Sequence, residues 1–131
     1  MLGPILLAAM QFVPNATTCA DSGNLPQQMM NACAAWDFEQ ADAELNATWP
    51  VALDYVRTHL SESSDWDDRP SGEERLRAAQ QAWIILRDEH CGVWGYHMRG
   101  GTAEPLLYNG CRASMTRERI EDLRSLMLED Q

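Results

Sequence analysis

Most of the chain's reactive side-chain types gather in one short stretch, Gln80 to Cys91, with the sequence QQAWIILRDEHC. Gln80, Trp83, Arg87 and Cys91 follow one another at steps of three and four residues, which places them on one face of a helix. His90 beside Cys91 suggests a thiolate site, but a disulfide at Cys91 would remove that nucleophile, and we favour the disulfide. The stretch is therefore interpreted as a structural helix.

Neither a catalytic group nor a metal site is predicted elsewhere. The three histidines, His59, His90 and His97, are too scattered to form a metal motif. No Ser or Cys is paired with a base at a spacing typical of nucleophilic catalysis. We therefore expect a protein that is not an enzyme and has no cofactor.

The polar segment Ser61 to Gly72 contains three aspartates and could suggest calcium. In an EF-hand loop, however, the places taken here by Arg69 and Pro70 need a ligand and a glycine. Calcium binding is rejected for this reason.

Four cysteines, Cys19, Cys33, Cys91 and Cys111, allow three disulfide pairings. None lies in a C-x-x-C motif, so redox catalysis and a zinc knuckle both lack their usual spacing. We expect the pairing that is local in sequence, Cys19–Cys33 and Cys91–Cys111, which would contribute about 3 kcal/mol per bridge. The alternative is four reduced cysteines in the core.

Composition indicates one acidic helical domain. The 131 residues include 45% hydrophobic residues and carry a formal net charge of −10. Few residues are β-branched, which favours helix. The negative charge argues against nucleic-acid binding; it can attract a basic protein partner or simply keep the protein soluble.

Apolar periodicity predicts three helices. The first starts at Leu25-Pro26 and runs to about residue 60, with a kink at Pro50. Ser71 with Glu74 forms a capping box for the second, which runs to Cys91-Gly92. The third starts at Thr102 and Pro105 and ends at Leu126 or Met127. The expected fold is all-α, a small three-helix bundle with a kinked long first helix and two disulfides.

The N-terminal residues 1–18 resemble a secretory signal. Their apolar run is too short to span a bilayer, and Ala16-Thr17-Thr18 offers small residues near a possible cleavage site. We expect a periplasmic or secreted protein whose helical domain covers residues 19–128. The alternative, a lipoprotein anchored at Cys19, is less favoured because Ala16 stands where a lipobox has a larger aliphatic residue.

The order and spacing of several residues resemble the N-terminal domain of the lysozyme inhibitor LprI family. The matching residues are Cys33, Ala41-Asp42-Ala43-Glu44-Leu45-Asn46, Leu76, Ala79-Gln80, Trp83, Arg87-Asp88, Cys91, Gly100-Gly101, Cys111, Thr116, Arg119 and Leu123. The resemblance implies an exported all-helical bacterial domain, and it suggests inhibition of lysozyme. An envelope-stress or interaction module with another protein partner is the alternative.

Polar residues on the first two helices could pair with one another. Asp42 and Asn46 lie one turn apart, and Gln80 and Arg87 lie two turns apart on the face that also carries Trp83. If the helices are antiparallel, an Asp42–Arg87 ion pair and an Asn46–Gln80 hydrogen bond are expected, since a buried Arg needs a partner. These residues are interpreted as structural.

The segment Val93 to Gly101 is the candidate binding site, as a glycine-rich loop held between Cys91 and Cys111. Trp94 and Tyr96 would supply apolar contacts, and His97 or Arg99 would meet a carboxylate of a glycosidase cleft. Preorganisation by the disulfide would lower the entropic cost of binding. The alternative is that the two aromatic rings fold back to cover the end of the bundle.

Overall fold

The computed structural model describes residues 11–128 and contains three long helices. They are α1 (Gln27–His59), α2 (Gly72–Gly95) and α3 (Glu104–Leu126), with two short 3-10 helices, η1 (Ser22–Asn24) and η2 (Tyr96–Met98). No strand forms within residues 11–128. The predicted all-α, three-helix architecture is confirmed.

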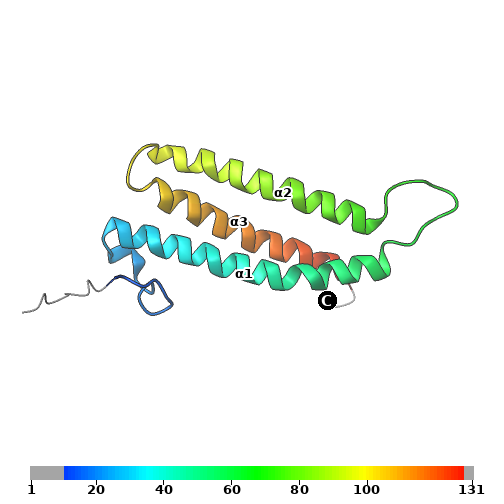
Figure 1. Ribbon diagram of the computed structural model, residues 1–131, viewed down its shortest axis with the longest axis horizontal. Helices are drawn as coiled ribbons and strands as arrows, with labels where there is room; N and C mark the ends of the chain where they lie inside the picture. The colour runs from blue at the N-terminus through cyan, green and yellow to red at the C-terminus, as the bar shows by residue number, and fades with distance from the viewer. Residues whose placement is uncertain (1–10, 129–131) are drawn as a thin grey trace, which may run out of the picture.

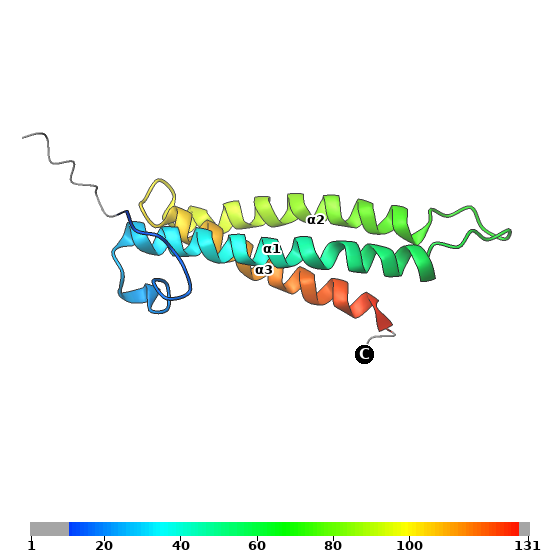
Figure 2. The same ribbon diagram turned by 60° about the horizontal axis from the view of Figure 1, so that its bottom comes forward.

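The three helices form an elongated bundle. Figure 1 shows that α1 and α3 run in the same direction and that α2 is antiparallel to both. In Figure 2, α1 lies in front of α3, which crosses behind it and emerges below it towards the C-terminal end, while α2 runs above α1. α1 packs most extensively against α3, and α2 also packs mainly against α3. The third helix is therefore the element that the other two share.

Two disulfides close one end of the bundle, where α1 and α3 begin and α2 ends. They are Cys19–Cys33 and Cys91–Cys111, with Cα–Cα distances of 5.6 and 5.5 Å. All four cysteines are consumed, so the predicted local pairing is confirmed. We refer to this end as the disulfide end.

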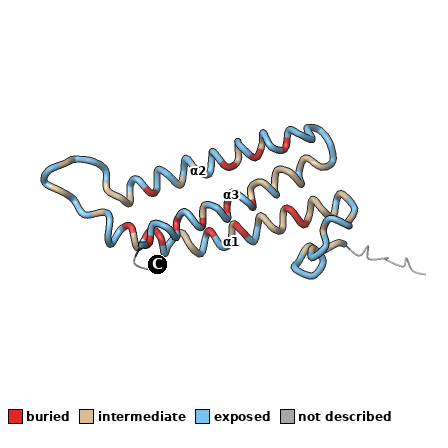
Figure 3. Tube along the Cα trace, turned by 180° about the vertical axis from the view of Figure 1, so that it is seen from behind, coloured by how far each residue is buried: buried red, intermediate tan, exposed pale blue. Residues whose placement is uncertain are grey.

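The apolar core lies in the opposite half of the bundle. It consists of Leu45, Ala52, Leu53, Val56, Leu76, Ile120, Leu123 and Met127. Figure 3 shows such buried positions recurring along the inward side of each helix, whereas the α1–α2 connection is largely exposed. Burial of apolar surface stabilises this half, so the disulfide end depends on other interactions.

Helix α1 continues through Pro50 instead of ending there. Pro50 lacks an N–H, so the carbonyl of Asn46, one turn earlier, loses its helical partner. Both residues are exposed, and water can bond that carbonyl at little cost. The uninterrupted helix is as predicted, and the kink stays a prediction.

A stack of alternating arginine and aromatic side chains occupies the middle of the bundle. In order its members are Tyr108, Arg112, Phe38, Arg87, Trp83 and Arg119, and each guanidinium carbon lies 3.7 to 5.9 Å from a neighbouring ring centroid. All three helices contribute to this arginine–aromatic stack. Desolvated cation–π contacts of this kind are each worth about 1 to 2 kcal/mol.

Arg87 is the buried centre of the stack, with only 6% of its surface exposed. Its Nε donates to Asp88 at 2.9 Å and its Nη1 donates to Thr116 at 3.4 Å. Arg112 also approaches Asp88, at 3.6 Å. One carboxylate therefore neutralises two of the three stacked guanidinium groups.

The predicted ion pair and hydrogen bond between α1 and α2 are wrong. Arg87 pairs with its neighbour Asp88 instead of Asp42, and Gln80 accepts a hydrogen bond from Arg119 at 2.9 Å instead of bonding Asn46. The reason is that α2 packs more extensively against α3 than against α1, so Gln80 meets Arg119 of α3, while Arg87 takes the carboxylate of its own helix neighbour Asp88. Asp42 instead accepts a long hydrogen bond, of 3.5 Å, from the side-chain amide of Asn46.

Helix α2 begins as the capping pattern predicts. The hydroxyl of Ser71 accepts a hydrogen bond from the backbone N–H of Glu74 at 3.2 Å. Gly72 donates its N–H to the carbonyl of Leu60 at 3.1 Å, and a Cβ at Gly72 would collide with that carbonyl oxygen. Glycine is thus required where the α1–α2 connection closes.

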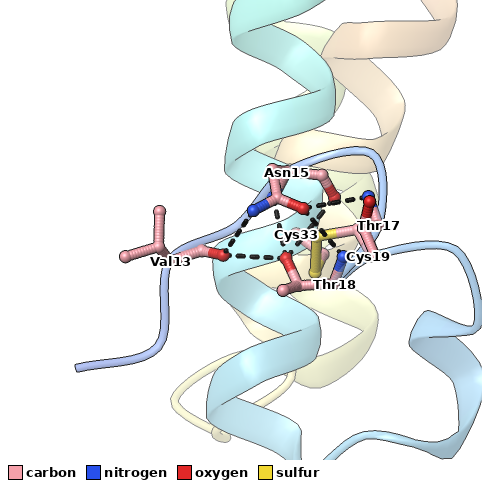
Figure 4. The surroundings of a disulfide bond; sticks show 6 residues. All are labelled: Val13, Asn15, Thr17, Thr18, Cys19 and Cys33. Carbon is pink, nitrogen blue, oxygen red and sulfur yellow. Dashed lines mark hydrogen bonds between the residues drawn. A yellow bond between two sulfur atoms is a disulfide. The ribbon is translucent and has the colours of Figure 1, made fainter. Parts of the chain in front are cut away.

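The N-terminal segment is held by a capped turn beside the first disulfide (Figure 4). Asn15 Oδ1 accepts the backbone N–H groups of Thr17 and Thr18, at 2.9 and 2.8 Å, and the N–H of Cys19 donates to the Asn15 carbonyl at 2.9 Å. This turn presents Cys19 to Cys33 on α1. Residues 1–10, most of the predicted signal-like segment, lie outside the described residues.

The arginine–aromatic stack predicts a large effect for Arg87→Ala. The substitution removes contacts to two rings and one carboxylate in the interior, so we expect the free energy of unfolding to fall by about 2 to 4 kcal/mol in urea titrations. The control is Arg69→Ala, which breaks an exposed ion pair with Asp67 and should change it by about 0.5 kcal/mol or less. An unchanged unfolding curve for Arg87→Ala would refute a structural role for the stack.

A second prediction concerns pH. Hydrogen bonds from Arg57 and Arg77 hold the pKa of Glu73 at about 2, below its ordinary 4.5. A lowered folded-state pKa means that the Glu73 contribution to stability is fully present above about pH 4.5 and is lost as the pH falls towards 2. We expect Glu73→Gln to lower the melting temperature at pH 7, with the difference from wild type vanishing near pH 2. Glu62→Gln, in the exposed connection, is the control and should show no such convergence.

Candidate functional site

The predicted binding segment is mostly helical, which corrects the expectation of a loop. α2 continues to Gly95, so Trp94 lies in its last turn, and Tyr96 and His97 lie in η2. The helix extends because Gly95 adopts helical angles and packs its bare Cα against Glu104 and Tyr108 of α3. Close packing against α3 therefore outweighs the poor helix propensity of glycine.

The turn between α2 and α3 is fixed at three points. The Cys91–Cys111 disulfide joins the two helices, and Cys91 is completely buried. The N–H of Gly100 donates to the Glu104 carboxylate at 3.1 Å. Asn31 of α1 donates to the carbonyl of Thr102 at 2.7 Å. The segment is thus tethered to all three helices.

Four apolar side chains of this segment are exposed, and together we term them the disulfide-end patch. They are Val93, Trp94, Tyr96 and Met98, with exposed fractions of 69%, 49%, 55% and 46%. Each ring is about half covered by the protein and half open to solvent. Several exposed apolar groups in one short segment are typical of a binding surface.

His97 and Arg99, the two residues predicted to meet a carboxylate, each lie against an aromatic ring of the patch. His97 meets Trp94 edge-on, with ring centroids 5.0 Å apart, and the Arg99 guanidinium lies 4.3 Å from the Tyr96 ring centroid. The structure therefore forms two separate pairs, Trp94–His97 and Tyr96–Arg99. The second pair holds a guanidinium beside an aromatic ring, where it can meet an anionic group.

A groove of 450 Å³ runs from Trp94 along the junction of α2 and α3. It is lined by His90, Trp94, Gly110, Cys111, Ser114, Met115 and Glu118. Sequence reasoning did not identify Ser114 or Glu118 as site residues. Their positions three and seven residues after Cys111 share its helix face, which is the signal that could have found them.

The remaining predicted structural residues border a second, smaller groove between α1 and α2. Asp42, Asn46, Gln80 and Arg87 line it together with apolar side chains, and its volume is 220 Å³. Trp83 lies within the arginine–aromatic stack and against the apolar core. Among residues 11–128 no three His, Cys, Asp or Glu side chains come together as a metal site would require.

Comparison with known proteins shows the family. Residues 19–123 match the family described as lysozyme inhibitor LprI, which covers most of the chain. The chain belongs to the lysozyme inhibitor LprI family. The resemblance read from the cysteine and helix motifs is confirmed, and the family is named for inhibition of an enzyme and not for a catalytic activity.

Two relatives extend this finding. An uncharacterized protein of Rhizobium meliloti (strain 1021) is 41% identical over 102 residues, covering 77% of this chain and 73% of that protein. A crystal structure of a DUF1311 family protein from Pseudomonas putida KT2440 superposes with a TM-score of 0.63 at 30% identity, covering 76% of this chain and 92% of that one. The three-helix fold is thus shared with an experimentally determined relative.

Across residues 11–128, no helix combines the length and the apolar character needed to cross a membrane.

Two glycines near the site give opposed predictions. Gly100 has φ +77°, and a Cβ there meets nothing within 4 Å, so Gly100→Ala should cost about 1 kcal/mol of stability through backbone strain alone. Gly110 is an exposed position within α3 with equally open space, so Gly110→Ala should stabilise by up to about 1 kcal/mol through helix propensity. Chemical denaturation of both variants checks this, and a stabilising Gly100→Ala would contradict the assigned turn.

Proposed function

We propose that this LprI family protein is exported and inhibits a basic lysozyme by binding it with the disulfide-end patch. The observation that carries the proposal is the patch itself. It places half-exposed Trp94 and Tyr96 beside His97 and Arg99 on a segment tethered to three helices. The family name supports lysozyme as the class of target.

The chemistry of the patch suits a glycosidase cleft. Such clefts present paired carboxylates, and Arg99 or His97 could donate a charge-assisted hydrogen bond to one of them. Trp94 and Tyr96 would fill the apolar sugar-binding surface around those carboxylates. Because the segment is already ordered, little conformational entropy would be lost on binding.

Net charge supports a basic partner. The chain carries −10, so its field attracts a cationic enzyme and raises the rate of encounter. Arg99 of the patch would then meet the local carboxylates after that encounter. Long-range attraction and short-range contact thus involve opposite charges on different parts of the surface.

Export fits the covalent structure. The chain has two disulfides, and structural disulfides typically form and persist in an oxidising compartment such as the periplasm or the extracellular space. The signal-like character of residues 1–18 agrees with that location.

A second candidate is an exported interaction or envelope-stress module with a different protein partner. It is favoured by the largely apolar character of the patch, since Val93 and Met98 would suit many protein surfaces. Affinity capture from a periplasmic extract with the oxidised protein distinguishes the two, because lysozyme is recovered only under the first proposal.

Inhibition of lysozyme is tested with variants of the patch and with a matched tryptophan control outside it. The oxidised protein should inhibit a basic lysozyme, and Trp94→Ala or Arg99→Ala should raise the inhibition constant by about tenfold or more. Trp66→Ala is the matched control, because Trp66 is 79% exposed in the α1–α2 connection at the far end of the bundle. Its inhibition constant should change by less than about twofold. Absence of inhibition at micromolar excess across several lysozyme types would defeat the proposal.

A further inference from the structure

Helix α2 carries a second apolar surface that the proposed function does not use. Its members lie on one side of the helix and are all exposed: Ala78, Ala79, Ala82, Ile85 and Leu86. Ile85 and Leu86 have exposed fractions of 65% and 58%. We refer to these five residues as the α2 stripe.

The stripe lies on the side of α2 that faces away from the bundle. The inward side presents Leu76, Trp83, Arg87 and Cys91, which pack on the core, the arginine–aromatic stack and α3. A helix with apolar groups on both sides is normally covered on both sides. The α2 stripe therefore points to a partner.

We propose that this partner is a second copy of the chain, with the two α2 helices packed antiparallel across a two-fold axis at Ala82. Each α2 residue of one copy then faces the α2 residue of the second copy that lies the same number of positions from Ala82 in the opposite direction. Ala78 faces Leu86 of the second copy, and Ala79 faces its Ile85. Small side chains thus receive large ones, and Ala82 at the axis lets the backbones approach closely.

The flanking charges match the same arrangement. Arg75 and Glu89, seven residues on either side of Ala82, would face each other twice across the axis, and so would Glu74 and His90. All four side chains are exposed. An axis at Glu89, which lies on the same side of the helix, would instead bring two carboxylates together. The charges therefore favour an axis at Ala82 over one at Glu89.

The net negative charge of the chain opposes formation of the dimer. Two copies at −10 repel, but the repulsion is screened beyond about 8 Å at about 0.15 M salt, whereas the facing pairs act at contact distance. The dimer should accordingly be measured at that ionic strength.

An antiparallel dimer leaves Trp94 outside the interface, because Trp94 borders the groove between α2 and α3, whereas Val93 lies seven residues after Leu86 on the side of the stripe and would lie at the edge of the interface. Because the two α2 helices point in opposite directions, the two patches would lie at opposite ends of the assembly. The dimer would then offer two separate binding surfaces. The inference itself does not depend on what the patch binds.

Sedimentation equilibrium of the oxidised protein tests the dimer. Between about 1 and 100 µM at about 0.15 M salt, the apparent mass should rise from monomer to dimer. Leu86→Asp should raise the dissociation constant by about tenfold or more. Val51→Asp is the control, because Val51 is 56% exposed on α1, away from the stripe, and its substitution should leave the constant within about twofold. Melting curves confirm that each variant is folded.

Charge reversal tests the register. Arg75→Glu changes the net charge from −10 to −12, and Glu89→Arg changes it to −8. If Arg75 faces Glu89 across the axis, each single variant should raise the dissociation constant of the dimer by about threefold or more, and the double variant should restore it. If repulsion between the net charges of the two copies decided the affinity instead, Glu89→Arg alone would strengthen the dimer. A chain that stays monomeric at 100 µM, a dimer unaffected by Leu86→Asp, or a double variant without recovery would each overturn the proposal.

Discussion

The burial of Arg87 is the constraint on which the bundle depends. A guanidinium with 6% exposure is tolerated only where its charge and its flat faces are both satisfied. Asp88 meets the charge, while Phe38 and Trp83 cover the faces. Since Phe38 lies on α1 and Thr116, the remaining partner, lies on α3, one side chain fixes the relative positions of all three helices.

The stack also explains how the two halves of the bundle differ. Beyond it on one side, the apolar core around Ile120 and Leu123 holds the helices together. On the other side, at the disulfide end, few large apolar residues are buried, and two disulfides hold the segments together instead. The disulfide end can therefore expose Trp94 and Tyr96 without loss of the fold, because its stability does not depend on burying these two side chains. A small domain can in this way keep a rigid apolar surface in contact with water.

Several features of the site and fold followed from local sequence. Cysteine spacing predicted both disulfides, and Ser71 and Glu74 predicted the start of α2. The segment after Cys91 contained the residues that form two pairs in space, Trp94 with His97 and Tyr96 with Arg99. The loop expected there was wrong, because the packing of Gly95 against α3 is a contact between elements that glycine propensity does not reveal. Ser114 and Glu118 were missed for a similar reason, since their groove exists only where α2 and α3 meet.

By itself, the sequence determined the all-helical class, the family and the acidic surface, because each depends on residue types and spacing within single segments. Only the tertiary structure decided which helix lies next to which. The partners of Arg87 and Gln80 depend on that choice, and so does the exposure of Ile85 and Leu86. The physical reason is that α2 is apolar on two sides, and periodicity cannot say which side the bundle buries. Packing against α3 through Arg87 and Cys91 settles it and leaves the other side to solvent.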